Sequence, residues 1–207
     1  MIQRLIANMT DDPAGAYAAL LPYVLGVALA VILLHLVASL VLRPNPPRWT
    51  ARWNLWEKLI YLVTLLAVGV LAVTSFYAVL TVGHMLGWML YVHLLGAGPF
   101  VVLLLLIALT WAHACRFGPR KLEVNANDIA ANASEALRFG WLAKISFWIM
   151  LAAGVATAGT MLVSMLPLLD TVAMQNMITL HRYAGLVLVV AVIFHFYGVW
   201  LGKLGLR

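Results

Sequence analysis

The sequence has little charge and almost no cysteine for its 207 residues. Only 10% of the residues are charged, whereas 65% are hydrophobic and the mean hydropathy is +1.00. A soluble domain contains roughly 45–50% apolar residues, so this composition excludes one. The single cysteine, Cys115, excludes an internal disulfide and a four-thiolate metal cluster within this chain. We therefore expect an integral membrane protein with its chemistry inside the lipid bilayer.

Acidic side chains are also scarce, with 7 against 13 lysines and arginines, which gives a formal charge of +6. Such a charge can indicate a nucleic-acid partner, but here the basic residues lie in short connections beside apolar stretches. In that position they orient a membrane protein. We therefore expect a lipid bilayer around the chain and no nucleic acid.

Five apolar stretches are each longer than the ~20 residues that a membrane-spanning helix needs. They cover residues 17–42, 55–82, 88–115, 142–169 and 177–201. Backbone groups in lipid must be hydrogen-bonded within their own segment, so these stretches predict helices. The expected fold class is an all-α integral membrane protein, a five-helix transmembrane bundle. Residues 1–16 would form a short outer N-terminal segment, and residues 17–207 a single transmembrane bundle.

The distribution of basic residues predicts the orientation of the bundle. All but two of the 13 lysines and arginines, Arg4 and Arg182, flank the first connection, the third connection or the C-terminal tail. Positive charge concentrates on the cytoplasmic side of membrane proteins. We expect the N-terminus outside and the C-terminus in the cytoplasm, as five spans require.

Two of the six histidines share one apolar run, LHRYAGLVLVVAVIFHF. His181 and His195 are 14 residues apart, which on an α-helix separates them by about 21 Å along the axis and leaves them within about 40° of the same face. A haem of the b type in an electron-transfer protein usually has two axial side-chain ligands. One helix could therefore contribute to two haems, one near each side of the membrane.

His93 is the expected partner of His181. It lies about five residues into the third predicted span, and His181 lies about four residues into the fifth, which runs in the same direction. The two residues therefore match in depth near the outer face. Gly96 and Gly185 follow one turn deeper and would leave room for a porphyrin edge. We predict an outer haem iron between His93 and His181.

The partner of His195 is less well defined by the pattern. His195 and His35 each lie eight residues before a basic residue at the cytoplasmic end of a span, so they match in depth. His113 lies nearer the end of its span and points away from His93 on a straight helix. We favour an inner haem between His195 and His35, with His113 as the alternative to His35. His84, in the outer turn, needs no special role.

Other side chains could contribute to a cofactor site. Arg182 follows His181 and could neutralise a haem propionate, although an interfacial arginine explains it equally well. Met150, Met161 and Met165 could act as axial ligands, but no pattern singles one out.

This arrangement resembles the membrane cytochrome b subunits of formate dehydrogenases, thiosulfate reductases and nickel-iron hydrogenases. The last helix of that family has two histidines at the spacing of His181 and His195, and a third histidine near the outer end of its second helix is matched by His93. The resemblance covers about residues 50–203 and leaves the first span as an addition.

The resemblance implies an electron-transfer subunit in the inner (cytoplasmic) membrane of a bacterium. Such a subunit holds two haems b, or one if the inner haem is absent, and exchanges electrons with a quinone. It assembles with iron-sulfur or multihaem subunits and with catalytic subunits. It is a part of an oxidoreductase complex and not a complete enzyme, so no catalytic residue is expected in this chain.

The sequence departs from the family at the inner haem. The family's first helix has an arginine and, three residues later, the histidine that completes this site, whereas the stretch RWNLWEKLIYLV places Lys58 and Tyr61 there. Either His35 or His113 replaces that histidine, or the inner haem is absent. The nitrate reductase membrane subunit also has five helices, but its ligands come from the second and fifth, and the second span here has no histidine.

Two further expectations concern quinone and the alternative function. A quinone pocket would lie beside the inner haem, near the loop that contains Trp53, Trp56 and Lys58. The alternative is a haem-free membrane anchor, or a small proton-relay or transport subunit, in which the histidines bond to one another or to backbone groups within the bundle.

Overall fold

The computed structural model describes residues 12–42, 53–117, 140–167 and 169–204. These ranges contain no strand, and they form five helices that are all long and apolar enough to cross a membrane. The helices are α2 (Pro13–Leu42), α3 (Leu55–Thr81), α4 (Gly87–Trp111), α6 (Trp141–Ser164) and α7 (Thr171–Leu204). The predicted class, an all-α multi-pass membrane protein, is therefore confirmed. Most of the predicted outer segment 1–16 lies outside the described residues.

Polar caps define where three of the helices begin. Asp12 and Asp170 each accept a hydrogen bond from the backbone N–H three residues later, at 2.9 and 2.7 Å. Asn54 and Glu57 form a reciprocal capping box at the start of α3. Because of these caps, α2 begins at residue 13 and α7 at residue 171, earlier than the predicted residues 17 and 177.

A tight turn that contains His84 joins α3 to α4. Gly83 and Gly87 have φ angles of 82° and 58°. Only glycine adopts these left-handed conformations without steric cost. The turn brings α3 and α4 together as an antiparallel pair.

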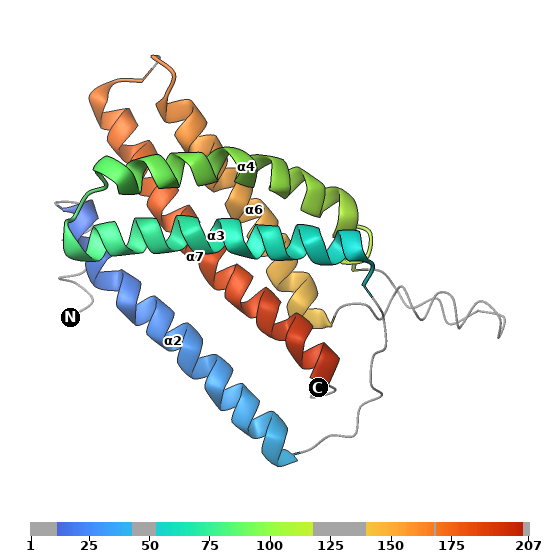
Figure 1. Ribbon diagram of the computed structural model, residues 1–207. Helices are drawn as coiled ribbons and strands as arrows, with labels where there is room; N and C mark the ends of the chain where they lie inside the picture. The colour runs from blue at the N-terminus through green and yellow to red at the C-terminus, as the bar shows by residue number, and fades with distance from the viewer. Residues whose placement is uncertain (1–11, 43–52, 118–139, 168, 205–207) are drawn as a thin grey trace.

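The bundle consists of two antiparallel pairs with α2 on one side (Figure 1). The α3–α4 pair lies across the α6–α7 pair, and the tip of the α6–α7 hairpin extends beyond it. The N-terminal end of α2 packs on the bundle through Tyr17 and Leu21, which contact Leu186 of α7. The remainder of α2 exposes mainly apolar side chains, as a lipid-facing helix does.

Small residues allow α6 and α7 to approach each other closely. A Cβ atom at Gly198 would lie 3.1 Å from the backbone nitrogen of Ala143. Membrane helices commonly pack through such small residues because dispersion contacts replace the hydrophobic effect in lipid. His195, one turn before Gly198, reaches the carbonyl oxygen of Ala143 as a result, with its Nδ1 atom at 2.8 Å.

We predict that Gly198→Val destabilises the protein by about 1–3 kcal/mol, because the added atoms press on the backbone of Ala143. Gly69→Val is the matched control, since a Cβ atom at that helical position meets nothing within 4 Å. Thermal unfolding of both purified variants in detergent measures the difference. Equal shifts in Tm would show that the close approach at Gly198 does not limit the packing.

Candidate cofactor site

The structure brings His93 and His181 together, as predicted. Their ring centroids are 6.5 Å apart and the ring planes are inclined at 73°. His93 lies six residues after the first residue of α4, whereas His181 lies ten residues after the first residue of α7. The two positions meet because the α6–α7 hairpin extends beyond the α3–α4 pair (Figure 1).

Hydrogen bonds fix the orientation of both imidazole rings. The Nδ1 atom of His181 lies 2.9 Å from the carbonyl oxygen of Thr157, which can only accept, so Nδ1 carries the proton. The Nδ1 atom of His93 lies 3.0 Å from the hydroxyl oxygen of Thr74. That hydroxyl donates its own proton to the carbonyl of Val70 at 2.7 Å, and therefore accepts from His93. Both histidines thus keep the lone pair on Nε2, the atom that binds a metal.

A cavity of about 270 Å³ lies between the helices at this pair. Both histidines line it, together with Gly185 of α7 and Gly98 of α4. A Cβ atom at Gly98 would meet nothing within 4 Å, whereas one at Gly96 would lie 3.2 Å from the Leu71 side chain. Gly185 was expected to leave room for a porphyrin edge, and it does line the cavity. In α4, however, the space is at Gly98, because Gly96 faces α3.

The geometry of the histidine pair fits a haem iron. Two metal–imidazole bonds of about 2 Å place the ring centres about 6 Å apart across one metal atom, close to what is found. Among the described residues, no group of three or more His, Cys, Asp or Glu side chains could hold a metal ion. Two imidazoles alone leave a bare ion without enough ligands, whereas a porphyrin supplies four further nitrogens. A haem iron, to which the porphyrin supplies four nitrogens, needs only two such side-chain ligands.

His195 is buried in an aromatic part of the core. Its Nδ1 atom donates to the carbonyl of Ala143, and the rings of Tyr61 and Phe147 both lie 6.0 Å from its ring centroid. His35 instead contacts the hydroxyl of Tyr197 through Nδ1, at 2.7 Å. Residues 195 and 197 lie roughly 200° apart around a helix, so these contacts are on different faces of α7. The structure does not place His35 opposite His195.

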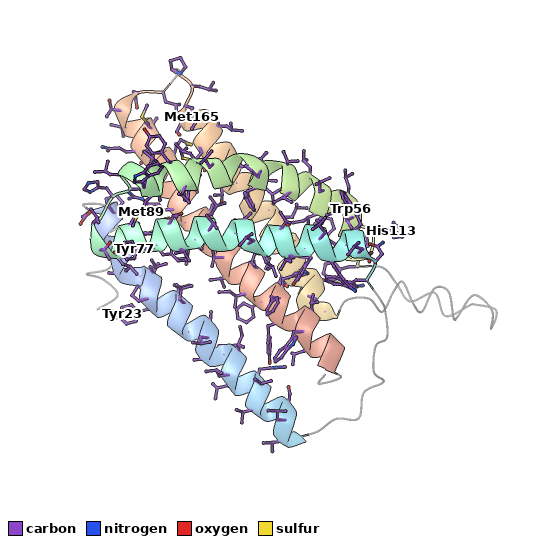
Figure 2. All side chains as sticks on the ribbon, viewed as in Figure 1. Tyr23, Trp56, Tyr77, Met89, His113 and Met165 are labelled. Atoms are coloured by element: carbon purple, nitrogen blue, oxygen red, sulfur yellow. The ribbon has the colours of Figure 1, made fainter. Side chains whose placement is uncertain are left out.

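The remaining histidines lie at the surface of the bundle. His113, labelled in Figure 2, is exposed beyond the end of α4, and its Nε2 atom is 3.3 Å from the guanidinium of Arg116. It therefore does not join His195 in the core. His84 is exposed in the α3–α4 turn, as expected.

The sulfur-containing side chains differ in their surroundings. Met161 and Met165 line the cavity, whereas Met150 packs in the other part of the core, in the cluster that contains Phe147. Burial raises the pKa of the Cys115 thiol to about 12, against a smaller opposing effect of the Lys144 charge. Cys115 therefore stays protonated near neutral pH.

Sequence reasoning missed the groups that orient the histidines. Thr74 lies 19 residues before His93 and the Thr157 carbonyl lies 24 residues before His181, so no short motif joins them. Tyr17 of α2 also lines the cavity. A threonine or tyrosine inside a span is a weak signal, because a threonine hydroxyl there usually bonds to a carbonyl of its own helix.

These features define a multi-pass membrane protein with a histidine pair buried between its helices. Comparison of the chain with protein-family models, with curated proteins and with solved structures gives no match. Its function must therefore follow from the site, which is the part of a fold that carries chemistry.

We predict that Thr74→Val destabilises the protein by about 1 kcal/mol, because the Nδ1–H group of His93 loses its hydrogen bond to the Thr74 hydroxyl inside the membrane. Thr110→Val is the control, since that hydroxyl bonds to a carbonyl of its own helix. Thermal unfolding in detergent reports the change. If the two variants unfold alike, Thr74 does not hold the His93 ring.

Proposed function

We propose that this chain is the membrane cytochrome b subunit of a respiratory oxidoreductase complex. It binds haem b between His93 and His181 and passes electrons between a membrane quinone and a partner subunit. The observation that carries the proposal is the 6.5 Å separation of two imidazole rings whose Nδ1 atoms are already engaged. Haem b, when bound, supplies one-electron oxidation and reduction.

The residues around the pair prepare it for this role. Thr74 and the Thr157 carbonyl hold the two rings and make Nε2 more basic, as outer hydrogen-bond partners of metal ligands do. The lining of the cavity is mainly apolar, which limits the access of water to the cofactor. The chain thus contributes position and environment, and the cofactor contributes the electron chemistry.

Tyr61 marks the difference from the formate dehydrogenase type of cytochrome b. In the matching stretch, Tyr61 stands where the family has the histidine that completes the inner haem, and its ring lies 6.0 Å from that of His195. A tyrosine therefore faces His195 at the family's ligand position. We propose one haem at His93 and His181. A second haem, bound by His195 with His35 or His113, stays a prediction.

Quinone exchange is proposed at the Tyr61 end of the bundle. The rings of Tyr61 and Trp111 are 6.0 Å apart, and Trp53 packs against both. The Tyr61 hydroxyl and the Trp111 Nε1–H group are buried without a hydrogen-bond partner among the described residues. A quinone carbonyl is an acceptor of suitable chemistry for these donors. Trp56 and Lys58 are exposed nearby on α3.

The orientation and the partners belong to the same proposal. The positive-inside rule places the N-terminus outside and the Tyr61 end of the bundle toward the cytoplasm of a bacterial cell. The histidine pair then lies near the outer face. From there it would exchange electrons with an iron-sulfur or multihaem subunit and, through it, with a catalytic subunit.

We predict that His93→Ala and His181→Ala each abolish haem binding at this site, because one axial ligand is lost. Pyridine haemochrome quantitation and the α-band of the purified full-length chain measure this loss. His84→Ala, at an exposed histidine in the α3–α4 turn, should keep the haem content of the unmodified chain. An unmodified chain without haem would favour a membrane anchor or proton-relay subunit instead.

Haem stoichiometry tests the inner site separately. One haem per chain, unchanged in His195→Ala, is the result expected if Tyr61 has replaced the family's histidine. Two haems per chain, with one lost in His195→Ala, would establish the second site. Its opposite ligand would then be the residue, His35 or His113, whose alanine variant also loses one haem.

A further inference from the structure

Two polar side chains line the cavity beside the histidine pair, and a third packs against one of them. Arg182 follows His181 on α7 and lines the cavity, and Tyr17 lines it from α2. The rings of Tyr17 and Tyr183 pack edge to face with centroids 5.3 Å apart. An arginine and a tyrosine therefore border the same cavity as His93 and His181.

The described part of the protein does not bond all of these polar groups. The Tyr183 hydroxyl is buried without a hydrogen-bond partner there. Arg182 and Tyr17 likewise make no hydrogen bond or ion pair with another described residue. A charged side chain inside a span is costly and usually serves a function. A cation with neighbouring hydroxyl donors suits an anionic oxygen ligand, above all a carboxylate.

The packing of α2 holds Tyr17 at the cavity. Tyr17 is only 1% exposed, and Leu21 and Leu186 complete the small core around it. Along the rest of α2 most side chains are exposed. The best-packed part of this helix is therefore the part that borders the cofactor site.

We propose that Arg182 and the Tyr17 hydroxyl bind a propionate carboxylate of the haem, so that α2 is part of the cofactor site. This inference rests on the proposed haem at His93 and His181. A phospholipid headgroup offers a similar anionic oxygen, and the experiment must distinguish the two.

The test is a redox titration of the haem in the purified full-length chain. Loss of a nearby positive charge favours ferric over ferrous haem, so Arg182→Gln should lower the midpoint potential. We expect about a tenfold change in the equilibrium between the two states, which is 59 mV for one electron. Arg182→Lys should keep most of the potential, and Tyr17→Phe should lower it by less than Arg182→Gln. Arg116→Gln is the charge-matched control, because Arg116 lies beyond the C-terminal end of α4 and His93 lies near the N-terminal end. This variant should leave the midpoint potential unchanged.

The outcomes separate the inference from the proposed function. Unmodified chain without haem would refute the proposed function and the inference together. If Arg182→Gln binds haem with an unchanged midpoint potential, the inference is wrong but the proposed function stands. Loss of bound phospholipid from the same variant, measured by mass spectrometry, would then show that Arg182 binds a lipid. If Arg182→Gln retains no haem, restored haem in Arg182→Lys supports the inference. If Arg182→Lys also lacks haem, and Tyr17→Phe leaves the midpoint potential of the haem unchanged, the inference is contradicted.

Discussion

The structure depends on two hydrogen bonds that join α7 to α6. His181 donates to the carbonyl of Thr157 and His195 to that of Ala143, at 2.9 and 2.8 Å. Fourteen residues separate the donors on α7, and fourteen separate the acceptors on antiparallel α6. The two bonds therefore determine the register and the rotation of the pair. Each is costly to break inside a membrane, where no water replaces the lost partner.

Hydropathy was sufficient to predict the five spans, and counting along them was sufficient to predict that His93 meets His181. The residue positions within the predicted spans paired His93 with His181 correctly, although α7 begins six residues before the predicted span. Hydropathy locates the border of the apolar region, and the two histidines lie at similar depths from that border. Helix ends are determined by caps such as Asp170, and residues 171–176 extend the helix beyond the predicted span without changing the depth of His181.

Rotation about the helix axis could not be predicted in the same way. The depth of His35 matches that of His195, yet His35 contacts Tyr197 on another face of α7. Gly96 likewise has the expected depth, but it faces Leu71 of α3. Apolar residues surround each of these helices on nearly all sides, so the sequence has little amphipathic pattern that would show which face packs inward. Close contacts such as that of Gly198 with Ala143 determine which face of each helix packs inward. These contacts depend on pairs of residues far apart in the chain.

The two ends of the bundle have different consequences for a cofactor. At His181 the neighbouring positions are glycine, threonine and the cavity itself, so a large planar group can approach the ring. At His195 the rings of Tyr61 and Phe147 already lie within 6.0 Å, and a porphyrin there would have to displace at least one of them. Moving a buried aromatic ring costs several kcal/mol of packing unless the new ligand restores the contacts. The same α6–α7 register thus presents two imidazoles whose Nδ1 atoms are bonded to carbonyls, and Tyr61 of α3 and Phe147 of α6 pack against the ring of His195, whereas the ring of His181 borders the cavity.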